Sequence, residues 1–176
     1  MIDFSQNHFE LFGLPARFHC DAATLDRAYH ALQSEVHPDR YAAADEAARR
    51  VALQSSARVN EAYQALKAPV RRAEYLLSLH GVDALGETDT QLPLEFLEEQ
   101  LERREAAGDA LAARDSATLE ALLAQVRADA AALEETLGAL LDSDRAWQDA
   151  RMRVRELKFL DKLAADIDGM LAEIDG

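Results

Sequence analysis

The sequence has few of the residues that build disulfides, tight turns and sheets. Its 176 residues include one cysteine, four prolines and seven glycines, and aromatic residues make up only 6%. A single cysteine excludes an intramolecular disulfide and any Cys-x-x-Cys metal or redox motif. So few turn-forming residues argue against an all-β chain. We therefore predict an all-α protein of one domain or two small ones, in the reducing cytoplasm.

Long apolar runs and targeting signals are also missing. No apolar run approaches the length of about 20 residues that a membrane-spanning helix needs. The start, Met1-Ile2-Asp3-Phe4, carries an acid where a secretory signal has basic residues, and it lacks the arginines of a mitochondrial transit peptide. We expect a soluble protein that does not enter a membrane.

Basic residues are fewer than acidic ones, and nearly all of the acidic excess lies in the second half of the chain. The sequence has 19 Lys and Arg against 33 Asp and Glu, a net charge of −14. Residues 1–80 hold 9 basic and 10 acidic side chains, whereas residues 81–176 hold 10 and 23. An acidic half disfavours nucleic acid and anionic membranes as partners, because both attract positive charge. It suits a basic protein surface or plain solubility equally well.

The sequence lacks the patterns that mark catalytic and metal sites. The five histidines are scattered over separate predicted elements of the first half, at His8, His19, His30, His37 and His80. We find no Gly-rich phosphate loop, Walker lysine or His-Glu-x-x-His, and no Ser/His/Asp or Cys/His spacing that supports a nucleophile. We expect no enzyme, no cofactor and no bound metal.

Helical periodicity is what the sequence does have. In the first half it predicts helices over residues 5–11, 22–36, 43–67 and 68–80. In the second half it predicts helices over residues 94–108 and 116–141, and a third that follows a cap at Asp142 or Ser143 and runs to Ile174. Asp21 is a good N-cap for the helix over residues 22–36, and Asp115 or Ser116 for the helix over residues 116–141.

One stretch without periodicity separates the two halves. Residues 81–93 gather Gly, Asp, Thr and Pro, which favour loops. We predict a linker there, between a domain over residues 1–80 and a three-helix bundle over residues 94–176.

The helical pattern of the first half breaks at Val36-His37-Pro38-Asp39-Arg40. Pro38 lacks an N–H and biases His37 away from helical dihedrals, so two antiparallel helices should meet in a tight bend. At its tip, Asp39 can form a bidentate pair with a guanidinium, and His37 can donate a ring N–H. The tripeptide by itself is also explained by the end of a helix followed by an ordinary turn, with no role in binding.

The flanks of the tripeptide make it resemble a J-domain. They read Leu25-Asp26-Arg27-Ala28-Tyr29-His30-Ala31-Leu32 before it and Val59-Asn60-Glu61-Ala62-Tyr63-Gln64-Ala65-Leu66 after it, and the resemblance covers roughly residues 4–80. It implies that His37, Pro38 and Asp39 contact the ATPase module of a heat-shock chaperone and stimulate ATP hydrolysis there. The family's basic face on the preceding helix is thin here, with Arg27 on that helix and Arg40 beside the tripeptide.

Three further segments narrow the resemblance to the HscB family, the J-type co-chaperones of bacterial iron–sulfur cluster assembly. They are Phe12-Gly13-Leu14-Pro15-Ala16-Arg17, Arg72-Ala73-Glu74-Tyr75-Leu76-Leu77-Ser78-Leu79-His80-Gly81 and Phe159-Leu160-Asp161-Lys162-Leu163. The Cys-x-x-Cys region of eukaryotic relatives is missing, which favours the bacterial form. The resemblance implies an L-shaped, monomeric protein whose C-terminal bundle binds the scaffold protein IscU and delivers it to the chaperone HscA.

The positions that match the family's scaffold contacts are Leu97, Leu101, Glu102, Glu105 and Phe159. Phe159 lies about 160° around its helix from the core position Leu157, which predicts an exposed anchor. Leu97 and Leu101 share a face at i, i+4, and core packing explains them equally well. Glu98 stands where the family often has a hydrophobic residue, which predicts a smaller apolar patch. The alternatives are a J-domain co-chaperone with an unrelated client, and a non-catalytic helical adaptor.

Overall fold

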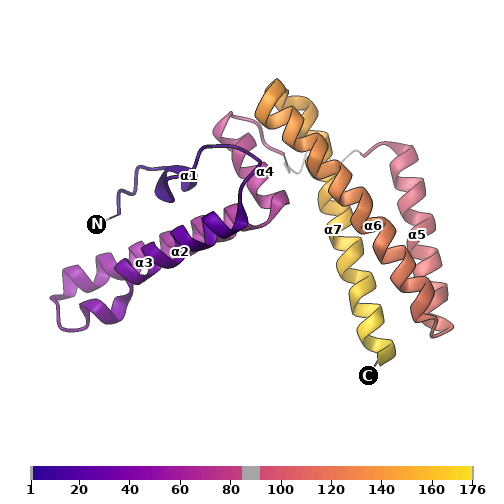
Figure 1. Ribbon diagram of the computed structural model, residues 1–176, viewed down its shortest axis with the longest axis horizontal. Coiled ribbons are helices and arrows are strands. Elements are labelled where there is room, and N and C mark those ends of the chain that lie inside the picture. The colour runs from indigo at the N-terminus through magenta and orange to yellow at the C-terminus, as the bar shows by residue number, and fades with distance from the viewer. Residues whose placement is uncertain (1, 85–91, 176) are drawn as a thin grey trace. The chain divides into compact units, whose positions relative to one another are not determined.

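The computed structural model describes residues 2–84 and 92–175, and within these ranges the chain is helical and contains no strand (Figure 1). This confirms the predicted all-α class. The chain divides into two compact units, Met1–Leu79 and His80–Gly176. Within the described ranges, no helix combines the length and apolar character that crossing a bilayer demands. The predicted L shape stays a prediction.

The first unit contains α1 (His8–Leu11), α2 (Ala22–Val36), the 3₁₀ turn η1 (Pro38–Tyr41), α3 (Glu46–Lys67) and α4 (Pro69–Leu79). The second unit contains α5 (Leu94–Ala112), α6 (Ser116–Gly138), the π-helical segment η2 (Ala139–Asp144) and α7 (Trp147–Asp175).

The core of the first unit forms where α2 and α4 pack against α3. The largest side chains buried there are Phe9, Leu25, Leu66, Leu76 and Leu77. One buried cation ties the elements together, because Arg72 donates to the carbonyls of Phe18 at 2.6 Å and Leu66 at 2.7 Å. A buried guanidinium is tolerated only when its N–H groups find such acceptors.

Side-chain caps set where the helices of the first unit begin. Asp21 caps α2 and accepts from the Thr24 N–H, as predicted. The predicted starts of α1 at Ser5 and of α3 at residue 43 are wrong. Asn7 forms a capping box with Glu10, so α1 begins at His8. Asp45 caps α3, which begins at Glu46.

The second unit is a bundle of α5, α6 and α7 around one apolar core. The buried side chains of that core come from all three helices: Ala107, Ala110, Leu119, Leu123, Val126, Leu160, Leu163 and Ile167. The bundle agrees with the predicted architecture. The prediction that the first helix ends near Gly108 is wrong, because α5 buries alanines on both sides of that glycine and continues to Ala112.

Two arginines with left-handed backbone conformations lie in the connections between helices of the bundle. Arg114 and Arg145 both have φ of 53°, a conformation that glycine usually takes. The Arg114 side chain donates to the Ile174 carbonyl at 2.7 Å, which gives the position a reason to be arginine. The predicted cap of the last helix at Asp142 or Ser143 is wrong, because both lie in η2 and α7 begins only after Arg145, at Trp147.

Most of the predicted linker, residues 85–91, lies outside the described residues. Of its described part, Gly81 has φ of 72° and ends the helical path of α4, as predicted. Val82 and Ala84 are buried, and the Ala84 carbonyl accepts from Arg155 at 2.8 Å. The domain boundaries and the linker stay predictions.

Candidate docking surfaces

The bend between α2 and α3 is held by hydrogen bonds within the predicted tripeptide. His37 leaves the helical path, with φ −57° and ψ 128°. Its Nδ1 atom accepts from the Asp39 N–H at 3.3 Å, and its carbonyl accepts from the Arg40 N–H at 3.0 Å. Because Pro38 fixes φ at the first position of η1, the three residues form one compact turn.

The turn presents its charged group to solvent. The side chain of Asp39 is 91% exposed and that of His37 is 49% exposed, with 3.6 Å between the Asp39 carboxylate and the His37 Nδ1 atom. An exposed carboxylate in a fixed turn can accept a guanidinium without a large loss of conformational entropy. The structure therefore places His37, Pro38 and Asp39 together as the sequence predicted.

The next two residues tie the turn to the end of α2. Arg40 donates to the Ser34 carbonyl at 3.1 Å, and the Tyr41 hydroxyl lies 3.4 Å from the Glu35 carbonyl. These bonds satisfy carbonyls that the end of a helix leaves without partners. Arg40 thus lies beside the tripeptide and also stabilises it.

Arg27 lies apart from the bend. It stands ten positions before His37 on α2, about 15 Å along the helix axis at 1.5 Å per residue. Its guanidinium donates to the Thr24 hydroxyl at 2.8 Å, and its side chain is exposed. A partner that contacts both Arg27 and Asp39 must therefore extend along α2.

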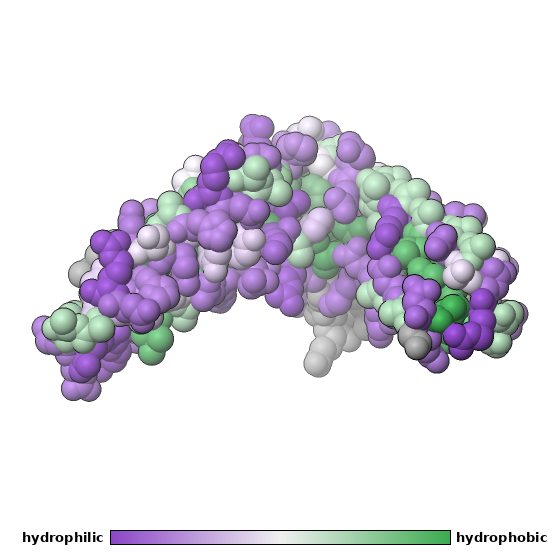
Figure 2. All heavy atoms as spheres, turned by 60° about the horizontal axis from the view of Figure 1, so that its bottom comes forward, coloured by the Kyte–Doolittle hydropathy of each residue, from purple (hydrophilic) through white to green (hydrophobic). Residues whose placement is uncertain are grey.

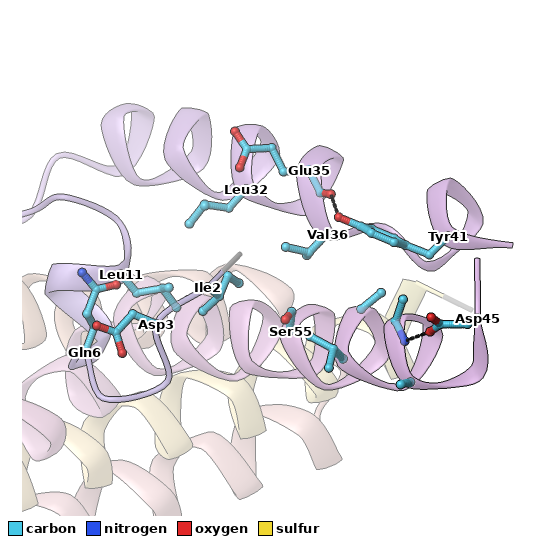
Figure 3. A pocket seen from close by; sticks show the side chains of 14 residues that line it. Ile2, Asp3, Gln6, Leu11, Leu32, Glu35, Val36, Tyr41, Asp45 and Ser55 are labelled. Atoms are coloured by element: carbon cyan, nitrogen blue, oxygen red, sulfur yellow. Dashed lines mark hydrogen bonds between the residues drawn. The ribbon is translucent and has the colours of Figure 1, made fainter. Parts of the chain in front are cut away.

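A cleft of about 780 Å³ lies behind the bend, between α2 and α3 (Figure 3). Apolar side chains from both helices line it, including Leu32, Val36 and Val51, and the Tyr41 ring closes one end. This cleft was not predicted from the sequence. Val36 precedes the tripeptide and Tyr41 follows Asp39 by two positions, so the cleft begins next to the turn.

The second predicted surface lies on α5. Leu94, Leu97 and Leu101 are 70%, 38% and 58% exposed, which makes them the large apolar side chains that α5 turns to solvent. The alternative that core packing explains Leu97 and Leu101 is therefore wrong. Hydrophobic patches are visible among hydrophilic side chains over the helices of this unit (Figure 2).

Phe159 joins this surface from α7, but its side chain is half-buried, whereas helical geometry predicted an exposed anchor. Its ring packs edge-on against Phe96, with 5.8 Å between centroids, and the Arg104 guanidinium lies 5.0 Å from its centroid. Arg104 follows Leu101 by three positions on the same face of α5. The structure therefore brings Phe159 beside the leucines. We call Leu94, Leu97, Leu101, Arg104 and Phe159 the leucine face.

Acidic side chains border the leucine face on α5. Glu98, Glu102, Glu105 and Asp109 are all exposed and follow one another at spacings of three and four. Glu105 lies about 40° around the helix from Leu101 and Glu102 about 100°, so Glu105 is nearer to the leucines. The border gives the surface a negative rim.

Burial shifts the pKa of a side chain in each unit from its usual value. Burial raises the pKa of Asp161, which follows Phe159 by two positions on α7. In the first unit, burial lowers the pKa of His8, whose ring stacks on Tyr75 with 4.1 Å between centroids.

Among residues 2–84 and 92–175, no three His, Cys, Asp or Glu side chains gather in a way that would hold a metal ion.

Comparisons with known proteins cover both units. Residues 7–75 match the family described as DnaJ domain, and residues 92–168 match the HSCB C-terminal oligomerisation domain. The co-chaperone protein HscB homolog of Burkholderia multivorans is 46% identical over 175 residues, 99% of each chain.

Solved structures agree in sequence and fold. Chaperone HscB from Vibrio cholerae is 38% identical with a TM-score of 0.87, covering 96% of this chain and 99% of that one. Human co-chaperone protein HscB is 26% identical with a TM-score of 0.87, covering 94% of this chain and 82% of that one. With a J-domain bend in the first unit and a matching bundle in the second, the chain belongs to the HscB family of co-chaperones.

Proposed function

We propose that this co-chaperone binds the iron–sulfur scaffold IscU, delivers it to the chaperone HscA and stimulates the ATPase of HscA. The observation that carries the proposal is the turn at His37, Pro38 and Asp39, because its carboxylate is 91% exposed and its shape is fixed by internal hydrogen bonds. A turn that served only to reverse the chain would not need this charge at its tip.

In this proposal the first unit acts on the chaperone without supplying a catalytic group. Asp39 pairs with an arginine of the ATPase module, and His37 holds the backbone of Asp39 in place. Arg40 keeps the turn against α2, and Arg27 extends the contact along that helix. ATP is hydrolysed on HscA, so the co-chaperone itself is not an enzyme.

The second unit holds the client. Leu97, Leu101 and Phe159 supply apolar and aromatic contact area, which is the kind of anchor that dominates protein interfaces. Glu102 and Glu105 pair with basic residues of IscU at the rim. The cluster is carried by IscU. We further propose that the chain acts as a monomer in the bacterial cytoplasm.

The experiment that tests the proposal measures ATP hydrolysis by purified HscA with the co-chaperone, with and without IscU. The expected result is stimulation by the co-chaperone alone and greater stimulation when IscU is added. Stimulation that IscU does not change would favour an unrelated client, which a pull-down with IscU tests directly. The absence of any stimulation, or full stimulation by the His37→Gln variant, would favour the helical adaptor.

A further inference from the structure

A groove of about 470 Å³ runs between α5 and α7 in the second unit. Leu111 of α5 and Met170 of α7, both half-buried, give it apolar walls, and Arg104 lines it from α5. On α7 its sides include Asp166, Gly169 and Glu173, all of which are exposed. A groove with apolar walls and charged edges suits an extended segment or a helix of another protein.

The groove continues the leucine face. Arg104 belongs to both, because its guanidinium covers the Phe159 ring at 5.0 Å and also lies 3.6 Å from the Asp166 carboxylate. Gly108 lies on the same face of α5 as Leu97, about 20° around the helix. A protein bound to the leucine face would therefore reach the groove without leaving that side of the bundle.

The charge around the groove selects a basic occupant. Residues 81–176 carry 10 basic and 23 acidic side chains. Of the charged side chains that line the groove, Asp166 pairs with Arg104, and Glu173 adds a further carboxylate on the α7 side. A second copy of this chain would bring the same excess of negative charge and be repelled, whereas a basic segment would be attracted.

Gly169 is independent evidence that a partner's backbone comes close to α7. It lies inside α7, where glycine is less favourable than alanine, and its φ is not in the left-handed region. A Cβ added there would meet no atom within 4 Å, so packing within this chain does not require glycine. Gly108 of α5 has the same property. Glycine at such a position admits the backbone of a partner.

We propose that the client-binding surface extends from the leucine face along the α5–α7 groove, where it receives a basic segment of the client that carries an apolar side chain. The inference rests on the proposed function, because the client is taken to be IscU. It adds Gly169, Met170 and Glu173 to the residues that recognise the client. None of these was predicted from the sequence.

The test measures the affinity of IscU for the full-length chain and five variants, namely two in the groove, two controls and Leu101→Ala, after circular dichroism has shown that each variant is folded. Gly169→Leu fills the edge of the groove, and Glu173→Lys reverses its charge. Both are exposed helical positions, so both variants should fold. The matched controls are Ala124→Leu and Glu120→Lys, at exposed positions of α6, which does not line the groove.

Gly169→Leu and Glu173→Lys should each weaken IscU binding by about fivefold or more, while each control stays within about twofold of wild type. Wild-type affinity in both groove variants, with binding weakened by Leu101→Ala, would overturn the groove and leave the proposed function intact. A wild-type chain that does not bind IscU at all would overturn both. Self-association that Gly169→Leu abolishes in sedimentation would show that the groove holds a second copy, and would also overturn the inference.

Discussion

The two units of this co-chaperone present surfaces of opposite kinds. The first half of the chain is nearly balanced in charge, and its surface depends on a single compact turn with one exposed carboxylate. The second half is strongly acidic, and its surface spreads over exposed leucines, a half-buried aromatic ring and a groove. One surface depends on the position of a few atoms, and the other depends on contact area.

This difference predicts different responses to mutation. A charge-assisted hydrogen bond loses its ionic contribution completely when one of its two charged groups is replaced by a neutral one. Contact area is lost in parts, because each truncated side chain removes only its own share. The first surface should therefore fail after a single conservative substitution, whereas the second should fail only after several.

The largest effect is expected from Asp39→Asn. The amide keeps the size of the side chain but removes its charge, so stimulation of the HscA ATPase should fall by about tenfold or more. Asp45→Asn is the matched control in the same connection, because asparagine caps a helix as well as aspartate does. The ATPase assay with each variant checks this, and equal activities for the two variants would contradict the role of the Asp39 charge.

The next effect is expected from Leu97→Ala combined with Leu101→Ala. Each single change should weaken IscU binding by about threefold, and the pair by about tenfold. Thermal stability should change little in Leu101→Ala, because that side chain is 58% exposed, and somewhat more in Leu97→Ala, where the side chain is 38% exposed. Leu53→Ala, exposed on α3 of the first unit, is the control for losing a surface leucine. Titration calorimetry with IscU measures the series, and unaltered affinity in the double variant would remove the leucine face from the account.

Phe159→Ala should have a mixed effect, because the ring both packs within the bundle and borders the leucine face. Losing its contacts with Phe96 and Arg104 should lower the free energy of unfolding by about 2 kcal/mol, less than for a fully buried ring. IscU binding should weaken by about threefold. Urea unfolding followed by a binding titration separates the two effects. A variant that binds normally but unfolds more easily would assign Phe159 to packing alone.

The smallest effect is a difference in the pH dependence of the two units. Burial holds the pKa of His8 below 6.5, so the folded first unit binds this proton less readily than the unfolded chain does, and its stability should decline as the pH falls from 7 to 5. His8→Phe should reduce that decline.

Burial raises the pKa of Asp161 above 3.8, so its ionised form weakens the second unit at neutral pH, and this effect disappears as the pH falls toward 3.8. Asp161→Asn should therefore stabilise the second unit at pH 7 and lose that advantage in acid. Amide hydrogen exchange in α3 and in α6 follows the two units separately. An advantage of Asp161→Asn that grew in acid would contradict the assignment.

Local signals in the sequence were enough to predict the bend. Asp21 and Pro38 act through neighbouring backbone atoms, so both the start of α2 and the break after Val36 follow from nearest-neighbour chemistry. The all-α class and the bundle likewise follow from periodicity. The starts of α1 and α3 were missed because several residues compete as caps, and the structure selects Asn7 and Asp45.

Features that depend on contacts between helices were not predictable. The spacing of Leu97 did not show whether its side chain is buried or exposed, since a leucine at helical spacing fits a core and a surface equally well. The half-burial of Phe159 depends on where Phe96 and Arg104 of another helix lie. The connection at Arg145 takes a left-handed conformation without glycine, so the residues carry no turn signal.

The proposed delivery of the client requires that one chain hold the chaperone and the client at the same time. The direct test mixes two defective chains, the Asp39→Asn variant and the Leu97→Ala, Leu101→Ala variant, and measures IscU-dependent stimulation of the HscA ATPase at low IscU concentration. If delivery requires both surfaces on one molecule, the mixture will show no more IscU-dependent stimulation than the two variants show separately. Recovery of wild-type stimulation in the mixture would contradict the account.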